Sequence, residues 1–152
     1  MSTIRRATLD DLESVHQIET LSFEEGGYPS FVLRQMFDIS PDYFLVAEVD
    51  HRIFGYILGH INKNTNQGWL LSLGVHPDAR GKKLGRHLTE KLIDLLENDL
   101  STEICLTVHP DNEMAKKLYE KLGFKTMKIH DNYYNDLEPR LLMKKYNSLN
   151  QN

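Results

Sequence analysis

The sequence predicts an α/β fold in which a mixed β-sheet is covered by helices, and two patterns lead to this prediction. Apolar runs of strand length recur along the chain, and residues 69–75 form one that is rich in the residues of a buried strand. Leucines at steps of three and four, from Leu84 to Leu96, follow the period of one helical face. In chain order the patterns give β-α-α-β-β-β-α-β-α-β-β. The 152 residues suit one domain with a substantial core.

The first half of the chain carries clear signals for helix starts and turns. Residues 3–7 read as a short strand. Thr8 begins a helix that runs to about Ser22, because Asp11, three residues after Thr8, completes a capping box. The other elements predicted here are a turn at 24–29, a helix from Phe31 to about Asp38 that Ser30 caps, and strands at 43–49, 53–61 and 69–75, joined by turns at 50–51 and 62–68.

The second half continues with alternating strands and helices. Residues 103–108 form a strand, and Asn112 is placed to cap the helix that follows. Gly123 is a typical C-terminal stop for that helix. Two final strands are predicted at residues 124–130 and 140–145. We therefore predict a single domain over residues 1–146 and a polar C-terminal tail over residues 147–152.

Composition and charge narrow the class of protein. An apolar content of 40% and a charged content of 26% are ordinary for a soluble globular protein. The net charge of −4 argues against a nucleic-acid-binding protein, for which a basic face is expected. The single cysteine, Cys105, excludes an internal disulfide and is expected to pack as a small hydrophobe.

Targeting signals and metal sites are not expected. No apolar run approaches the length of a membrane span, and Arg5, Arg6 and Asp10 interrupt any signal peptide at the start. The histidines lack a ligand spacing such as His-Glu-x-x-His, so we expect no metal. We expect a cytoplasmic enzyme, a monomer or homodimer, that binds neither nucleic acid nor membrane.

The loop between the strand at 69–75 and the leucine-rich helix is the strongest functional signal. It contains two glycines and four cationic side chains within His76–Arg86. Glycine lets a backbone approach a ligand closely, and the first N–H groups of the next helix have no internal partners. Together they make a site for an anion such as pyrophosphate. A plain basic turn before a surface helix is the alternative, and the flanking strand and helix favour the phosphate site.

This loop differs from two well-known phosphate-binding patterns. Only three residues separate Gly81 from Gly85, so it is not the nucleotide P-loop, and it lacks the Gly-x-Gly that starts the dinucleotide fingerprint. Arg80-Gly81-Lys82-Lys83-Leu84-Gly85 resembles the coenzyme A pyrophosphate loop of the GCN5-related N-acetyltransferases (GNAT). Leu118-Tyr119-Glu120-Lys121-Leu122-Gly123-Phe124, preceded by Asn112, resembles a second motif of that family.

The resemblance implies the GNAT-type architecture over nearly the whole chain. That fold is a mixed, mostly antiparallel sheet of about seven strands with a splayed parallel pair, flanked by four helices. Tyr133-Tyr134-Asn135-Asp136 is similar to the tail of N-terminal amino-group acetyltransferases, including those that act on ribosomal proteins. Leu137 stands where those enzymes often carry glycine.

The resemblance also implies acetyl-CoA as co-substrate, with its pantetheine arm between the splayed strands. Backbone groups that lose their partners where strands part can pair with the amides of that arm, and Gly74 leaves room there. A simple bulge at Gly74 is the alternative interpretation. The cofactor-binding residues so implied are Leu73, Gly74, Val75, Arg80, Gly81, Lys82, Lys83, Leu84, Gly85, Arg86, Asn112 and Tyr119.

Acetyl transfer to an amine requires a proton acceptor for the amine and a proton donor for the departing sulfur. The family places Tyr119 near the sulfur, so Tyr119 is the candidate acid, and a purely packing role in its helix is the alternative. Related enzymes often carry Glu or His at the position of Thr107, which cannot act as a base. His109 lies two residues on and shares that strand face, so it is the candidate base, with a cap of the strand end as the equal alternative.

The acceptor is expected between the first helix–helix turn and the tyrosine pair. Glu24, Glu25, Tyr28 and Tyr134 are the candidate substrate-binding residues, because carboxylates attract a cationic amine and rings pack on its carbon skeleton. A solvated acidic turn and tyrosines that seal the sheet edge are the alternatives. The acceptor is then a peptide N-terminus or a small-molecule amine such as a polyamine or aminoglycoside. The rival function is a non-catalytic acyl-CoA-binding sensor.

Overall fold

The computed structural model describes residues 2–23 and 26–147, which form two compact units. Unit 1 comprises Met1–His60 with Ser72–Leu95, and unit 2 comprises Ile61–Leu71 with Leu96–Asn152. The strands are β1 (Ser2–Arg6), β2 (Phe44–Val49), β3 (Arg52–Asn62), β4 (Gln67–Val75), β5 (Glu103–Val108), β6 (Lys125–His130) and β7 (Arg140–Tyr146). The helices are α1 (Leu12–Phe23), α2 (Ser30–Ile39), α3 (Leu84–Asn98) and α4 (Glu113–Lys121), with short 3₁₀ turns η1 (Leu9–Asp11), η3 (Pro41–Tyr43) and η4 (Pro77–Ala79).

The seven strands form one sheet in the order β1-β2-β3-β4-β5-β7-β6. The pairs β1/β2, β2/β3, β5/β7 and β6/β7 are antiparallel, whereas β4 and β5 pair in parallel from Gln67–Glu103 to Trp69–Cys105. The predicted element order and the mixed, mostly antiparallel sheet are therefore confirmed, and the described residues also contain the four predicted helices.

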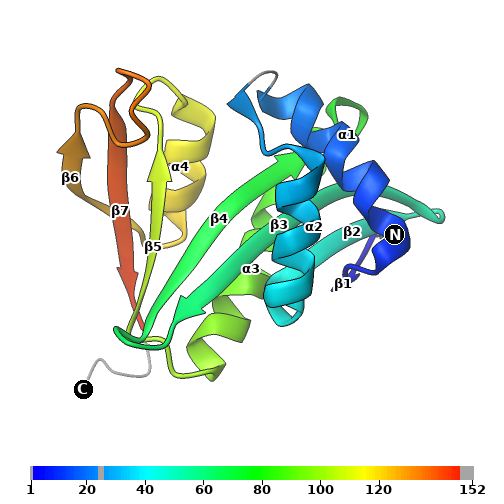
Figure 1. The fold of residues 1–152 in the computed structure, drawn as a ribbon, viewed down its shortest axis with the longest axis horizontal. Helices are drawn as coiled ribbons and strands as arrows, with labels where there is room; N and C mark the ends of the chain where they lie inside the picture. The colour runs from blue at the N-terminus through cyan, green and yellow to red at the C-terminus, as the bar shows by residue number, and fades with distance from the viewer. Residues whose placement is uncertain (1, 24–25, 148–152) are drawn as a thin grey trace. The chain divides into compact units, whose positions relative to one another are not determined.

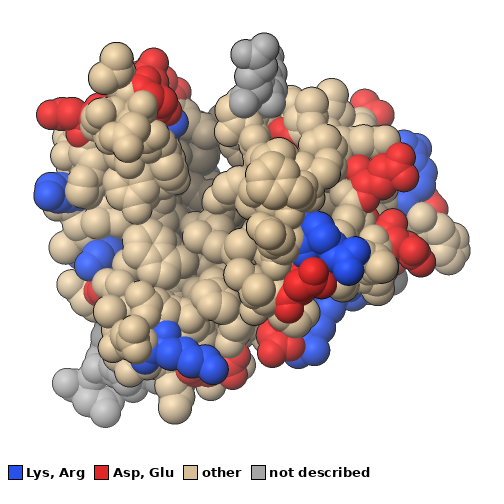
Figure 2. Space-filling view, viewed as in Figure 1, with Lys and Arg blue, Asp and Glu red and all other residues tan. Residues whose placement is uncertain are grey.

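In unit 1, helices cover both faces of the strands. Helices α1 and α2 lie on the near side of β2 and β3, and α3 lies on the far side (Figure 1). A side chain added at Gly55 would meet Leu88 of α3 at 3.0 Å, and one added at Gly74 would meet Ile18 of α1 at 3.0 Å. Both helix layers thus approach the strands closely at a glycine. On the outer face of α1 and α2, acidic and basic side chains are interspersed (Figure 2).

One of two local predictions in unit 1 is confirmed, and the other is wrong. Asp50 and His51 form the β2–β3 turn with φ of 49° and 64°, the positive values that a tight two-residue hairpin requires. The predicted cap of the second helix was wrong. Ser30 is the first residue of α2, Pro29 precedes it, and no side-chain hydrogen bond caps this helix start.

The corner between β1 and α1 is fixed by one carboxylate. Asp11 accepts hydrogen bonds from the Thr8 backbone N–H at 2.7 Å and from the Arg5 guanidinium at 2.7 and 3.1 Å. Arg5 also donates to Glu48 of β2 at 2.7 Å. Burial raises the pKa of Asp11, but the hydrogen bonds from Arg5 and Thr8 outweigh it, so this pKa lies below its ordinary value. The predicted capping carboxylate therefore also ties the first strand to the helix.

In unit 2, β7 lies between β5 and β6, and Leu106 of β5 is opposite Met143 of β7. Cys105 is buried as predicted, and burial raises the pKa of its thiol to about 11. Asn147, the first residue of the predicted polar tail, packs against the end of α3. This residue is 2% exposed, and its Nδ2 donates to the Glu97 and Ser101 carbonyls at 3.3 and 2.7 Å. Its side chain closes the last turn of α3 and the loop that follows.

The Asp11 corner generates a stability prediction. We expect Asp11→Asn to lower the free energy of unfolding by about 1–2 kcal/mol at pH 7, because the charged acceptor is lost. The pKa of Asp11 is lower in the folded state, so its contribution is present above the unfolded value of about 3.9 and disappears as the pH falls through the folded value. Urea unfolding at pH 7 and pH 2.5 measures both effects. Asp10→Asn, on the exposed neighbour, is the matched control, and equal losses in the two variants would contradict the prediction.

Candidate active site

The predicted pyrophosphate loop lies in unit 1 between β4 and α3. Its first turn, η4, is held by His76, whose Nδ1 accepts the Asp78 backbone N–H at 3.1 Å. Gly81 follows with φ of 85°, and a side chain added there would meet no atom within 4 Å. Glycine is therefore needed at this position for its backbone conformation, and the side of the loop where a side chain would project is open. The first intrahelical bond of α3 runs from His87 N–H to the Lys83 carbonyl, so the N–H groups of the first turn have no acceptor within the helix.

The cationic side chains of the loop differ in their surroundings. Arg80, Lys82 and Lys83 are exposed, whereas Arg86 donates to Glu90 one turn along α3 at 2.6 Å. Leu84 is 3% exposed and packs into the core, so only its backbone faces the loop. Gly85 is the second predicted glycine, and its carbonyl accepts the Thr89 hydroxyl at 2.7 Å. Charge on this loop thus comes mainly from Arg80, Lys82 and Lys83.

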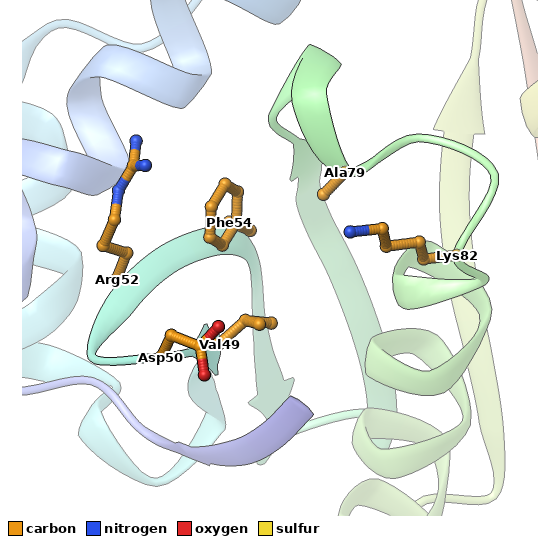
Figure 3. A pocket seen from close by; sticks show the side chains of 6 residues that line it. All are labelled: Val49, Asp50, Arg52, Phe54, Ala79 and Lys82. Atoms are coloured by element: carbon orange, nitrogen blue, oxygen red, sulfur yellow. The ribbon is translucent and has the colours of Figure 1, made fainter. Parts of the chain in front are cut away.

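A cavity of about 200 Å³ lies beside this loop in unit 1 (Figure 3). The β2–β3 hairpin contributes Asp50, Arg52 and Phe54 to its lining, and the loop contributes Ala79 and Lys82. The Arg52 guanidinium lies 4.9 Å from the centroid of the Phe54 ring, and the Lys82 side chain extends toward the cavity from the other side (Figure 3). The cavity therefore combines an aromatic face with two cationic groups.

The end of β4 presents the residues predicted to face the cofactor arm. Leu73 and Val75 are half-buried and alternate with buried Ser72 and Gly74. A side chain on Gly74 would lie 2.6 Å from Cε1 of Tyr56. The room that Gly74 leaves on that face is thus occupied by the Tyr56 ring.

Helix α4 in unit 2 carries the predicted acid. Tyr119 is buried and meets Phe124 edge-on, with ring centroids 5.8 Å apart. Burial raises the pKa of the Tyr119 phenol, so the group stays protonated throughout the physiological range. Asn112 caps α4 as predicted, because its Oδ1 accepts the Ala115 N–H at 3.2 Å.

The end of β5 and the segment 131–139 form a hydrogen-bonded group in unit 2. Thr107 and Tyr134 share a hydroxyl–hydroxyl hydrogen bond of 2.8 Å. His109 Nδ1 accepts the Asp111 N–H at 3.1 Å, so its Nε2 carries the proton and donates to the Glu138 carboxylate at 3.1 Å. Glu138 was not among the predicted residues. The Thr107 hydroxyl is thus hydrogen-bonded to Tyr134, the tyrosine predicted to bind substrate.

Sequence reasoning missed a buried polar cluster in unit 1. Glu19 of α1 is 1% exposed, and its carboxylate accepts hydrogen bonds from the hydroxyls of Tyr56 at 2.6 Å and Ser72 at 3.0 Å. The signal was present, because Glu19 follows Val15 by four residues and so lies on the core-facing side of its helix. Of the predicted acceptor residues, Tyr28 follows Gly27, and a side chain added at Gly27 would meet Glu19 Cγ at 3.1 Å. Glu24 and Glu25 lie outside the described residues.

Neither a metal-ion cluster nor a membrane-spanning helix occurs among the described residues. No group of three or more His, Cys, Asp and Glu side chains within 2–23 and 26–147 is arranged to hold a metal ion. In the same part of the chain, no helix has the length and apolar character needed to cross a membrane.

Comparison with known proteins places the chain in a family. The profile of the acetyltransferase (GNAT) family matches residues 12–124. An uncharacterized N-acetyltransferase of Methanocaldococcus jannaschii is 33% identical over 141 residues, covering 92% of this chain and 88% of that protein. An N-alpha-acetyltransferase of Saccharolobus solfataricus is 33% identical over 152 residues, covering 93% and 90%. The crystal structure of Ard1 from Thermoplasma volcanium has a TM-score of 0.88 at 27% identity and covers 95% of this chain and 97% of that one. The chain therefore belongs to the acetyltransferase (GNAT) family and is an N-acetyltransferase.

Proposed function

We propose that this enzyme transfers the acetyl group of acetyl-CoA to the α-amino group at the N-terminus of a protein or peptide. The observation that carries the proposal is the open, glycine-containing basic loop at the start of α3, because it offers backbone N–H groups to the pyrophosphate of a coenzyme. The acceptor class is supported by the similarity to the N-alpha-acetyltransferase of S. solfataricus and by the tyrosine pair at residues 133–134.

The loop residues divide the work of binding the cofactor. Backbone N–H groups from Gly81 to Arg86 contact the pyrophosphate, and Gly81 keeps the approach open. Arg80 and Lys82 add positive charge without a fixed geometry, since both side chains are exposed. Leu73, Gly74 and Val75 offer backbone groups of β4 to the pantetheine amides.

Tyr119 supplies the proton that the chemistry needs. In the proposed reaction the neutral amine attacks the thioester carbon, the nitrogen gives up a proton to His109, and the carbon–sulfur bond breaks. The departing thiolate takes a proton from the Tyr119 phenol, and exchange with solvent returns Tyr119 and His109 to their starting protonation states. Burial favours the neutral phenol, so the Tyr119 hydroxyl carries its proton at the start of each turnover. Asn112 contributes its amide group to the cofactor arm.

His109 is the proposed acceptor of the amine proton. Its Nδ1 carries no proton because it accepts the Asp111 N–H. Once the hydrogen bond from the Asp111 N–H opens, Nδ1 takes up the amine proton, and the Glu138 carboxylate at 3.1 Å and the Asp111 carboxylate at 3.8 Å stabilise the imidazolium that results. The two carboxylates therefore support the charged form that a base must reach.

A thiol-release assay tests the proposal as a whole. Wild-type protein is incubated with acetyl-CoA and peptides beginning with Ala, Ser and Met, with spermidine and an aminoglycoside as small-molecule amines. We expect thiol release with at least one peptide and acetylation of its N-terminus by mass spectrometry. Turnover with the small amines alone assigns the acceptor to that class, and cofactor binding without any turnover supports the sensor.

The first prediction from this function concerns Gly81. We expect Gly81→Leu to weaken acetyl-CoA binding strongly, because the side chain strains the backbone and enters the open side of the loop. Arg80→Ala should weaken binding less, and more visibly at low salt, since exposed charges are screened. Isothermal titration calorimetry measures both. Gly123→Leu is the matched control, because Gly123 also has positive φ but lies in unit 2. Unchanged affinity in a folded Gly81 variant would refute the loop assignment.

The second prediction concerns Tyr119. We expect Tyr119→Phe to leave acetyl-CoA affinity nearly unchanged and to lower turnover by roughly 10²–10⁴-fold, as for a lost general acid. The ring and its contact with Phe124 remain, so packing is preserved. Steady-state kinetics on the best peptide measure the effect, with Tyr146→Phe, an exposed tyrosine of the same unit, as control. If both variants turn over at the wild-type rate, Tyr119 serves packing only.

The third prediction concerns Tyr134, whose ring is exposed and lies 5.1 Å from the Arg140 guanidinium. We expect Tyr134→Ala to raise the peptide KM about tenfold, roughly the contribution of one aromatic contact, and to leave acetyl-CoA affinity unchanged. Tyr134→Phe removes only the hydrogen bond to Thr107 and should have a smaller effect. A loss of stability in Tyr134→Ala with unchanged acceptor kinetics would show that the segment is structural.

A further inference from the structure

The cavity between the β2–β3 hairpin and the loop after β4 is a feature of unit 1 that the proposed reaction leaves unexplained (Figure 3). Its volume is about 200 Å³. A molecule of liquid water takes up about 30 Å³, so a space of this size holds roughly seven waters or an organic molecule of roughly ten non-hydrogen atoms. The cavity is therefore too small for a whole coenzyme and large enough for one ring with one substituent.

The two walls of the cavity are joined to each other. The Phe54 carbonyl of β3 accepts the His76 backbone N–H at 2.7 Å, directly before η4. The rings of these two residues also meet edge-on, with centroids 5.8 Å apart and an interplanar angle of 87°. Ala79, at the end of η4, is 2% exposed, so the loop side of the cavity is packed as well. The cavity thus lies between fixed elements, which lowers the free-energy cost of ordering a ligand there.

Two cationic side chains approach the cavity from opposite sides. The Arg52 guanidinium lies 4.9 Å from the Phe54 ring centroid, and Lys82 extends toward the cavity from the loop (Figure 3). Among the described residues, neither cation has an ion-pair partner. Asp50 contributes one carboxylate to the lining, so the walls carry two positive charges and one negative charge. The excess of one positive charge matches a ligand that carries a single negative charge.

We propose that this cavity is a second ligand site, which binds a small aromatic carboxylate. The ring of the ligand packs against Phe54, since aromatic rings in contact attract each other in offset or edge-to-face arrangements. Its carboxylate lies between Arg52 and Lys82 and accepts charge-assisted hydrogen bonds from both. The Asp50 carboxylate repels a second negative charge, so a monoanion is preferred to a dianion.

Lys82 connects this site to the proposed pyrophosphate loop, because its side chain lines the cavity and its backbone belongs to the loop. A carboxylate that holds the Lys82 ammonium in the cavity withdraws it from the coenzyme and also repels the pyrophosphate. We therefore expect the two ligands to weaken each other's binding, and by the same factor, because coupling between two sites is reciprocal. This coupling rests on the proposed function, whereas the site itself does not.

The test is a titration of the full-length protein with benzoate in the absence of coenzyme, followed by ¹H–¹⁵N NMR at constant ionic strength. Benzyl alcohol, which has the ring without the charge, and acetate, which has the charge without the ring, are the comparison probes. Arg52→Gln and Lys82→Gln each remove one cation from exposed positions, so both variants should fold. Lys83→Gln is the matched control, because Lys83 is exposed in the same loop and does not line the cavity. Calorimetric titration with acetyl-CoA, with and without benzoate, measures the coupling.

We expect benzoate to shift the amide signals of Phe54, Ala79 and Lys82. It should bind about fivefold more weakly to Arg52→Gln and to Lys82→Gln, the effect of one lost contact with an exposed charge, and within about twofold of wild type to Lys83→Gln. Benzyl alcohol and acetate should each bind about fivefold more weakly than benzoate. Saturating benzoate should weaken acetyl-CoA binding about fivefold, and Arg52→Gln should leave the affinity for acetyl-CoA alone unchanged.

Three results of the benzoate titration would overturn the inference: no shifts around the cavity, equal binding of benzyl alcohol and benzoate, or equal effects of Lys82→Gln and Lys83→Gln. Weaker binding of acetyl-CoA alone to Arg52→Gln also overturns it, because the cavity then belongs to the coenzyme site. Benzoate binding without any effect on acetyl-CoA overturns the coupling through Lys82. If acetyl-CoA does not bind at all, the proposed function fails, and the benzoate titration by itself decides whether the cavity is a ligand site.

Discussion

Unit 1 depends on the close approach of β4 to β3 and α1 at Gly74. A methyl group there would lie 2.6 Å from the Tyr56 ring and 3.0 Å from Ile18, so any other residue would force these elements apart. The approach brings the Tyr56 hydroxyl to the Glu19 carboxylate and to Ser72. The close packing and the buried Glu19 carboxylate therefore depend on each other. The carboxylate is stable only because the packing places its two hydroxyl donors within hydrogen-bond distance.

At the end of β5 in unit 2, polar side chains also have hydrogen-bond partners from distant parts of the chain. Thr107 is engaged with Tyr134, and His109 is engaged with Glu138 and the Asp111 N–H. The segment that carries these partners is held by its own hydrogen bonds as well, since Asn132 Oδ1 accepts the Leu137 N–H at 2.7 Å. An exposed segment is thus ordered by polar contacts, and the residues that we propose for acceptor binding keep defined positions.

In the loop at the start of α3, which we propose as the pyrophosphate site, the number of basic residues does not give the number of free positive charges. Arg86 is paired with Glu90 at 2.6 Å, and Leu84 is buried, although both belong to the motif. Backbone N–H groups at a helix start act from fixed positions, whereas exposed lysines and arginines are mobile and screened. For the proposed site, we therefore expect the conformation of Gly81, with φ of 85°, and the start of α3 at Leu84 to matter more than the number of cations.

The sequence by itself determined the order of strands and helices, the capping residues Thr8, Asp11 and Asn112, and the motif residues of the family, because these depend on neighbours within one or two turns of chain. It did not determine the partners of those residues. Glu138 beside His109 and the Glu19–Tyr56–Ser72 cluster join residues between 16 and 53 positions apart, and a sequence pattern carries no distance between such residues. The sequence predicted free space beside Gly74, and in the structure the Tyr56 ring occupies the position of the missing side chain. Local propensity determined the helices and strands. The hydrogen-bond partners of the side chains depend on tertiary packing, because packing decides which donor reaches which buried acceptor.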